Sequence, residues 1–373
     1  MRARFLPPAA RATAIAVAVL FLAAACAPRS DEIGFIGDLT GKQSELGVSG
    51  RNGALLRLEE ENARARVGGL RFRLVAEDDA NSPDGFHAAV QDLVARKIGA
   101  VIGPYTSAIA SLTAAETRLL FLSPTASAES LSGKDDMLLR LTGSSSGGAR
   151  ALAAKAASTY AARSASILFD STNGIYADDF MKAFETSFAQ AGGRVLARES
   201  YESSAQNVAF TPILQRLLSA HPSLLLVIAN GSDTALVIRR AKQLMPQLLT
   251  VAAGWAATTD FLKYGGSAMD GTLFEEQFDP ASTSPAYVAF VDAYRKRFGS
   301  APSFSSLYSY DAAGILVAAL SAGAKSPQEI KKRLLAMPRV EGLQSEFRFT
   351  ATGDVERDNP IFVVRGQGYE ALR

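Results

Sequence analysis

Two apolar runs of the sequence end in turns rich in hydroxyl side chains, at 101–107 (VIGPYTS) and 119–127 (LLFLSPTAS). If the runs are neighbouring parallel strands, Thr106, Ser107, Thr125 and Ser127 meet at the edge where open α/β sheets bind ligands. The first turn also opens a predicted helix, whose free N–H groups and dipole favour an anion such as a carboxylate. Ser107 could be the N-cap of that helix, and each hydroxyl taken alone could be only a cap or turn residue. The matching ends of the two runs nevertheless predict a site for a polar ligand.

A second pattern with chemical potential is Gly143-Ser144-Ser145-Ser146-Gly147, which matches the G-x-S-x-G motif of serine hydrolases. That motif needs a preceding strand, a following helix, and a downstream acid and histidine. The only downstream histidine is His221, where a predicted helix turns into a strand. The pattern therefore favours a flexible turn over a nucleophile.

Cofactor and metal chemistry have no support in the sequence. The glycines at 34, 37, 41 and 47 lack the dinucleotide-binding spacing, and no P-loop is present. After residue 26 the chain has two histidines, His87 and His221, and no cysteine. This excludes a structural zinc site, a disulfide framework and a cysteine nucleophile. We therefore expect no catalytic residue, no cofactor and no metal.

The N-terminus has the form of an export signal. Arg2, Arg4 and Arg11 precede an apolar run over 12–25, which is too short to span a bilayer comfortably and ends in small residues. The segment 22–26 (LAAAC) resembles a bacterial lipobox, although Ala23 replaces its usual leucine. We expect a signal peptide at 1–25, lipidation of Cys26 and a tether over 26–30; a plain signal peptide is the alternative.

Composition indicates a globular chain of about two domains. It has 373 residues, of which 48% are hydrophobic and 20% charged. Removing residues 1–25 takes away three arginines and no acidic residue, so the 39 basic and 37 acidic residues become nearly balanced. This balance argues against nucleic acid as a partner, because nucleic-acid binding needs a clustered basic excess.

Apolar runs alternate with amphipathic stretches from residue 31 onward, which predicts an α/β fold with parallel sheets. A Gly/Ser cluster at 143–148 predicts a hinge between two halves. The expected strands are 32–37, 71–76, 98–102, 119–122, 166–170, 194–201, 223–229, 248–253 and 271–278. The expected helices are 50–65, 84–97, 108–117, 147–162, 178–191, 207–219, 232–244, 285–298, 307–323 and 326–336.

Motifs spread over nearly the whole mature chain resemble the leucine/isoleucine/valine-binding protein family. They include IGFIGDLTGKQSELG at the start, VIGPYTSAIAS, FLSPTAS, the ILFD strand with Tyr176, GW at 254–255 and YDAAG at 310–314. These proteins are the solute-binding components of ABC importers. The resemblance implies two doubly wound parallel-sheet lobes joined by three crossovers, as in type I periplasmic binding proteins. Lobe 1 would comprise 31–142 plus 272–350, and lobe 2 would comprise 143–271 plus 351–373.

The resemblance also implies a site. Ser107 and the turn from Thr125 to Ser127 would bind a ligand carboxylate, Tyr176 would close from the second lobe, and the turn at 230–233 would add contacts. The 42–46 loop would cover the mouth. The expected ligand-binding residues are Tyr105, Thr106, Ser107, Thr125, Ala126, Ser127, Tyr176, Ser232, Asp233 and Trp255, with Tyr105 and Trp255 as aromatic walls.

One departure bears on the ligand. Branched-chain amino-acid binders of this family carry an acidic residue two positions after the glycine of the GW segment, where this chain has Ala256. A buried ammonium without a counter-charge is costly, so another acid must replace it or the ligand lacks an amine. Asp233 is the nearest substitute, although it could equally be a helix N-cap, and Glu275 and Glu276 are looser candidates.

The sequence thus predicts an exported, membrane-anchored lipoprotein, monomeric and not an enzyme, on the periplasmic or cell-surface face of the membrane. It would capture a small polar organic ligand, foremost an amino acid or a related carboxylate or amide, and deliver it to an ABC permease. A ligand-sensing or envelope-regulatory lipoprotein of the same fold is the alternative.

Overall fold

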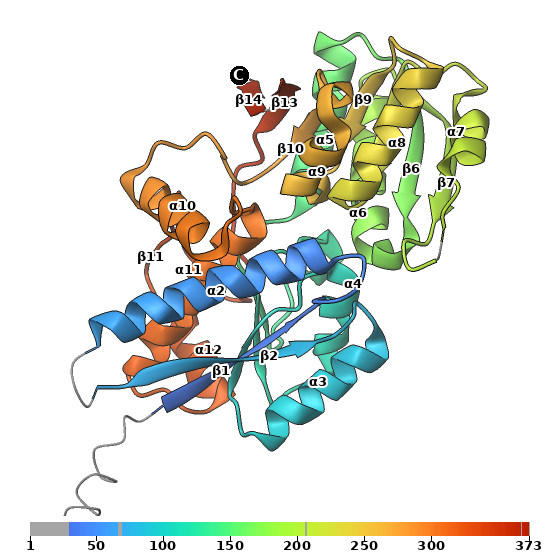
Figure 1. Cartoon of the computed structure of the whole chain (residues 1–373). Helices are drawn as coiled ribbons and strands as arrows, with labels where there is room; N and C mark the ends of the chain where they lie inside the picture. The colour runs from blue at the N-terminus through green and yellow to red at the C-terminus, as the bar shows by residue number, and fades with distance from the viewer. Residues whose placement is uncertain (1–29, 66–68, 206, 367, 373) are drawn as a thin grey trace, which may run out of the picture.

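Short apolar strands form two main β-sheets, one in each of two lobes (Figure 1). This computed structural model describes residues 30–65, 69–205, 207–366 and 368–372. The first sheet has five parallel strands in the order β2-β1-β3-β4-β5. They are β1 (Ser30–Gly37), β2 (Arg71–Asp78), β3 (Ala100–Ile102), β4 (Leu120–Ser123) and β5 (Leu138–Arg140). The expected leader, the lipidation site at Cys26 and most of the tether lie outside the described residues.

Helices cover both faces of the first sheet. Because side chains alternate along a strand, Ile33 and Phe35 of β1 join one apolar cluster and Ile36 joins another. The first cluster includes side chains of α2 (Ser44–Arg64), α10 (Pro285–Phe298), α11 (Phe304–Ser321) and α12 (Pro327–Leu335). The second includes side chains of α3 (Pro83–Ala95) and α4 (Ser107–Ala110). The first lobe is therefore completed by helices from the distant C-terminal third of the chain.

The second sheet has the order β14-β13-β10-β9-β8-β6-β7. Its strands are β6 (Ser164–Asp170), β7 (Arg194–Tyr201), β8 (Leu224–Ile228), β9 (Leu249–Ala252), β10 (Leu273–Glu275), β13 (Ile361–Arg365) and β14 (Gly368–Leu372). The helices α5 (Ser145–Thr159) and α6 (Gly174–Gln190) cover one face. The helices α7 (Phe210–Leu218), α8 (Gly231–Leu244) and α9 (Thr259–Gly265) cover the other.

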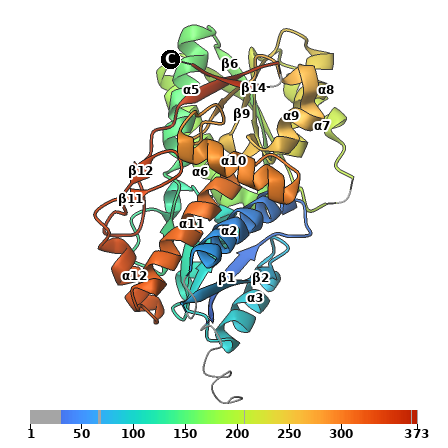
Figure 2. The same cartoon turned by 60° about the vertical axis from the view of Figure 1, so that its left-hand side comes forward.

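The chain crosses between the lobes three times, after β5, after β10 and before β13 (Figures 1 and 2). The expected α/β fold with two parallel-sheet lobes is confirmed, with the addition of an antiparallel β13–β14 hairpin at one edge. A small hairpin of β11 (Val340–Glu341) and β12 (Glu346–Phe347) lies outside both sheets.

The expected lobe boundaries need two corrections. Residues 272–350 were expected in lobe 1, yet β10 pairs with β9 and β13 and thus belongs to the second sheet. The segment after 350 was expected in lobe 2, yet Asp354 pairs with Arg140 at the end of β5 and Val355 bridges Phe349. Apolar periodicity does not reveal on which sheet a short strand pairs, which explains both differences.

The expected elements recur in place, with local differences. The helix expected at 50–65 begins at Ser44, so the second half of the expected 42–46 loop is helical. The helix expected at 108–117 is one α-turn followed by a 3₁₀ segment. The strands β5, β13 and β14 and the helix α9 were not expected. No helix within the described ranges has the length and apolar character needed to cross a membrane.

Candidate ligand-binding site between the lobes

Residues that follow the carboxyl ends of strands in both sheets converge on one cavity, which we call the inner cavity. Its empty volume is about 550 Å³, including space open to solvent. The first lobe contributes Leu46, Tyr105, Thr106, Ser107, Thr125 and Ser127, and also Phe304 at the start of α11. Five of these seven residues were expected from the sequence.

The second lobe closes the cavity from the opposite side. Tyr176 of α6 and Trp255 pack edge to face with ring centroids 5.7 Å apart. Asn173, which precedes α6, and Ser145, which begins α5, line the same space. Tyr176 and Trp255 therefore lie where the sequence predicted them, and Asn173 was missed although it stands in the same turn as Tyr176.

Local hydrogen bonds orient the first-lobe hydroxyls. Thr106, not Ser107, is the N-cap of α4, where its hydroxyl accepts from the Ile109 amide at 3.5 Å. The Ser107 hydroxyl instead accepts from the Ala128 amide at 3.1 Å. The Thr125 hydroxyl donates to the Tyr105 carbonyl at 2.5 Å. These bonds join the two turns into one rigid wall and correct the expected capping role of Ser107.

The helix end that was expected to attract a carboxylate is largely occupied. The α4 helix spans only Ser107–Ala110, and its Ala108 amide donates to Asn173 Oδ1 of the second lobe at 3.0 Å. The Ile109 amide is taken by Thr106. The helix therefore offers few free N–H groups to a ligand anion, and its end contributes to the contact between the lobes.

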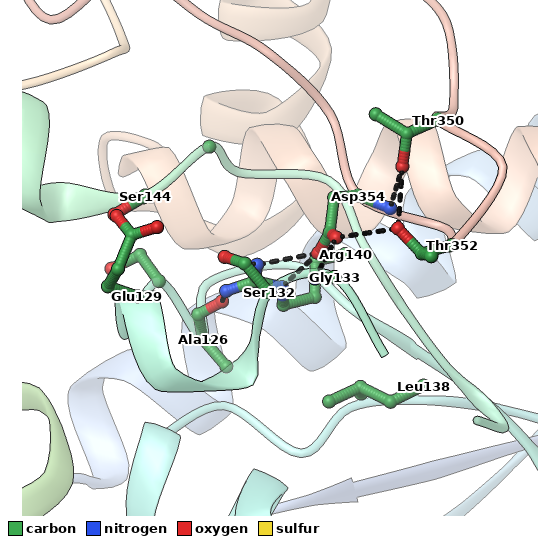
Figure 3. A network of polar contacts seen from close by, with 12 residues as sticks. Ala126, Glu129, Ser132, Gly133, Leu138, Arg140, Ser144, Thr350, Thr352 and Asp354 are labelled. Atoms are coloured by element: carbon green, nitrogen blue, oxygen red, sulfur yellow. Dashed lines mark hydrogen bonds and ion pairs between the residues drawn. The ribbon is translucent and has the colours of Figure 1, made fainter. Parts of the chain in front are cut away.

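A buried arginine supports the wall from behind (Figure 3). Arg140 is 1% exposed, and its Nη1 donates to the carbonyl oxygens of Ala128 at 2.8 Å and Ala126 at 3.5 Å. Its Nη2 pairs with Asp354 at 2.6 Å and also donates to Ser132. Ala126 was expected to touch the ligand, but it is buried behind the cavity and is not part of its lining. Its carbonyl instead anchors the Thr125–Ser127 turn.

Two adjacent glutamates from the β10 end are the acidic groups of the inner cavity. Glu275 accepts from the Gly254 amide at 3.0 Å, and Glu276 accepts from the Gln277 amide at 2.8 Å. Burial raises the pKa of Glu276 to about 8 and raises that of Glu275 well above its ordinary value. The lining contains no lysine, arginine or histidine among the described residues. The cavity therefore offers two carboxyl groups and no positive charge.

The crossovers form the floor of the cavity. The Gln277 side chain accepts from the Gly143 amide at 2.8 Å and donates to the Gly143 carbonyl at 3.2 Å and to Asn359 at 3.0 Å. One side chain thus ties all three crossovers together. Thr142 lies beside them, 6% exposed, and its hydroxyl has no hydrogen-bond partner among the described residues. Gly143 lies in the Gly/Ser cluster that was expected to be a hinge, whereas sequence reasoning missed Gln277, Asn359 and Thr142, because no motif marks side chains that meet only there.

The two expected residues of the 230–233 turn are not in the inner cavity. Ser232 lines a neighbouring cavity. The Asp233 carboxylate accepts from the Tyr201 hydroxyl at 2.9 Å and the Asn230 amide group at 3.1 Å. It is not the N-cap of α8 either, since Asn230 has that role. Its two hydrogen bonds within the lobe leave Glu275 and Glu276 as the acids that face a ligand.

The G-x-S-x-G pattern does not assemble a hydrolase site. The Ser145 hydroxyl donates to the Ser127 carbonyl at 3.1 Å. His221 is exposed in the turn before β8, whereas Ser145 lies at the carboxyl-end edge of the sheets. No cluster of three or more potential metal ligands occurs in the part of the chain that the structure describes.

Comparison with known proteins agrees with the two-lobed fold. The sequence profile of the family described as "Periplasmic binding protein" matches residues 32–369. The chain belongs to that family. This periplasmic binding protein is 26% identical to the Leu/Ile/Val-binding protein BraC3 of Rhizobium johnstonii over 292 residues, which cover 77% of this chain and 78% of the relative. The resemblance to the leucine/isoleucine/valine-binding family is thereby confirmed.

Solved structures show the same fold. The leucine-binding protein LivK of Thermotoga maritima superposes with a TM-score of 0.80 at 22% identity, covering 92% of this chain and 98% of LivK. A solute-binding protein of an ABC transporter from R. palustris in complex with benzoate has a TM-score of 0.81 at 17% identity, covering 92% of this chain and 95% of that protein. One fold therefore accompanies both an amino-acid binder and an aromatic-acid binder, so the ligand class must be argued from this chain's own cavity.

Proposed function

We propose that this periplasmic binding protein captures a small amine-bearing organic ligand, an amino acid or a close derivative, for an ABC importer. The observation that supports the proposal is the inner cavity, which both lobes line with hydroxyl groups, aromatic rings and two buried carboxyl groups. A few placed polar groups among aromatic side chains are typical of small-molecule sites. Transport rather than catalysis fits a family of solute-binding proteins.

Charge supports an amine over a simple carboxylic acid. A carboxylate ligand would bring a third acidic group into a cavity without a basic residue, whereas an ammonium would give Glu275 and Glu276 a counter-charge. An ammonium has three N–H donors, and the two glutamates together with the unpartnered Thr142 hydroxyl provide three acceptors. The acid missing at Ala256 is thus replaced from the adjacent strand β10, whose Glu275 accepts from Gly254.

Closure of the lobes provides the mechanism. Side chains of one lobe accept from backbone amides of the other at Asn173 with Ala108 (3.0 Å) and at Asp179 with Ser130 (2.8 Å). A ligand that touches both lobes favours this closed form, because an open form leaves half of its contacts unmade. The importer's permease would then receive the closed, liganded protein.

The anchor forms a second part of the proposal. Acylation of Cys26 would hold a monomeric binding protein on the periplasmic or cell-surface face of a membrane. A Cys26→Ser variant should move from the membrane fraction to the soluble fraction and lose the mass of its acyl chains. If the variant stays in the membrane fraction and keeps the mass of the acyl chains, the proposed anchor is refuted, while the proposed ligand site still stands.

The ligand class is tested by a thermal-shift screen of the purified exported protein. The library pairs amino acids with their deaminated acids and adds amides, ureas and benzoates. Ligand at 100 times its Kd stabilises by about 2.7 kcal/mol, which raises the Tm by several degrees. We expect shifts with amines that vanish for their deaminated analogues. Shifts with carboxylic acids alone would refute the amine assignment, and silence across the library would favour a sensing or regulatory role for the same fold.

A further inference from the structure

A second cavity, which we call the outer cavity, adjoins the inner one. It is lined by residues 41–46 of the first lobe and by the beginnings of α8 and α9 in the second. Leu46 and Trp255 line both cavities, so the two cavities meet at these side chains. Its empty volume of about 1020 Å³, including space open to solvent, exceeds that of the inner cavity. No expected binding residue except Ser232 and the shared Trp255 lines it.

One buried polar group on this cavity lacks a partner. The Gln43 side chain is 3% exposed, and its Nε2 has no hydrogen bond to any residue that the structure describes. Gln43 is the N-cap position of α2, yet its side chain makes no capping bond, so helix capping does not explain the buried amide. The Thr258 hydroxyl, 5% exposed, lies beside the Glu45 carboxylate and against Gly231 at the start of α8. A buried donor without a partner is costly, so the Gln43 amide points to an acceptor oxygen that a ligand supplies.

Part of the lining is apolar, and two of these apolar side chains are exposed. Leu236 is 47% exposed and Tyr264 is 43% exposed, and both lie on this cavity. Leu46 and Trp255 extend the apolar wall toward the inner cavity. A ligand that placed a hydrocarbon or aromatic group here would remove these side chains from water.

The charges on the cavity favour a neutral acceptor. Lys42, Glu45 and Asp260 line it, and Glu45 already accepts from the Thr259 hydroxyl and the Asp260 amide. The two acids outnumber the single lysine. An amide carbonyl therefore suits the Gln43 donor better than a second charged group does.

We propose that the ligand spans both cavities and is a short peptide or a related amide of an amino acid. Its ammonium group lies at Glu275 and Glu276, its first carbonyl passes Leu46 to reach the Gln43 amide, and an apolar second residue lies against Leu236 and Tyr264. This inference rests on the proposed function, since the amine end occupies the inner cavity described above.

The test is calorimetry on the purified exported protein with three probes: leucine, leucinamide and leucyl-leucine. We expect leucyl-leucine to bind at least tenfold more tightly than leucine. Gln43→Leu keeps roughly the size of the side chain and removes its donor. It should weaken the binding of leucyl-leucine about tenfold and leave the affinity for leucine unchanged. Gln190→Leu, at an exposed position of α6, is the matched control.

The outcomes separate the two proposals. Binding of leucine and leucyl-leucine with equal affinity, or an equal loss for both in Gln43→Leu, would overturn the extended ligand and leave the amine site standing. If none of the three probes binds, the same series with phenylalanine, lysine and glutamate as first residues decides the question. If free amino acids of this second series bind as tightly as the corresponding dipeptides, the extended ligand is also overturned. If no amine of either series binds, the proposed function itself is overturned.

Discussion

The Glu45 carboxylate at the start of α2 in the first lobe accepts a 2.6 Å hydrogen bond from the Thr259 hydroxyl at the start of α9 in the second lobe. The same oxygen accepts from the Asp260 amide at 3.0 Å. A side chain of one lobe therefore caps a helix of the other, where α9 has no capping side chain of its own. This contact joins the two lobes, so opening of the lobes would break it.

Loss of that contact should favour opening. In Glu45→Ala we expect ligand affinity to fall by roughly three- to tenfold, because removing a helix-capping acceptor costs about 1 kcal/mol. The loss should appear in the dissociation rate, measured by stopped-flow fluorescence of Trp255. Glu59→Ala is the control, since Glu59 lies on the same helix and pairs with Arg297 within the first lobe. Equal effects of the two substitutions would contradict a role in closure.

The pH dependence of the unfolding free energy should show that Glu276 is protonated in the folded protein. Burial raises its pKa from the ordinary 4.5 to about 8, so the empty folded protein holds a proton there that the unfolded chain releases. Stability of the empty protein should therefore fall as pH rises from about 4.5 to 8, and Glu276→Gln should reduce that slope. Chemical denaturation at several pH values measures the difference. An identical slope in both proteins would show that Glu276 is not protonated.

An amine ligand should bind more tightly as the pH rises, in contrast to the stability of the empty protein, which should fall. Its ammonium favours the ionised carboxyl group, so binding should release a proton, and affinity should rise between pH 6 and 8. Calorimetry in two buffers of different ionisation enthalpy counts the protons released. Proton uptake on binding would instead indicate a ligand carboxylate that receives a hydrogen bond from a protonated glutamic acid.

The Arg140–Asp354 pair should be a structural requirement of the first lobe. Arg140→Met removes the guanidinium group that donates to Asp354 Oδ1 and to the carbonyl groups of Ala126 and Ala128. Breaking a buried pair costs about 3–5 kcal/mol. Urea denaturation should show this loss, with weakened binding because the Thr125–Ser127 turn is released. Arg118→Met removes an exposed pair with Glu116 and should change little.

A glycine next to Glu275 should be required for binding. A methyl group at Gly148 would lie 2.1 Å from Glu275 Cγ, so Gly148→Ala must displace that side chain. We expect loss of amine binding while the helix α5 persists, because alanine is a better helix former than glycine. Gly174→Ala at the start of α6 meets no atom within 4 Å and should bind normally. Normal amine binding by Gly148→Ala would show that Glu275 does not take part in ligand binding.

Hydroxyl groups at strand ends could be predicted because their position depends on local sequence. Thr106, Ser107, Thr125 and Ser127 follow apolar runs that can only be buried strands, and parallel strands end at a common edge. The aromatic residues Tyr176 and Trp255 followed from the family resemblance. Ser232 and Asp233 were misplaced because a turn's residue types do not show how its side chains pair within the lobe.

The sequence alone determined the alternation of strands and helices, the two-lobed fold and the absence of a thiol after Cys26, because apolar periodicity and composition are local properties of the chain. Only the tertiary structure decided which acids face the cavity, how Gln277 joins the three crossovers and where Glu45 meets α9. These contacts join residues 82 to 214 positions apart, and their formation depends on how two separately folded sheets pack against each other.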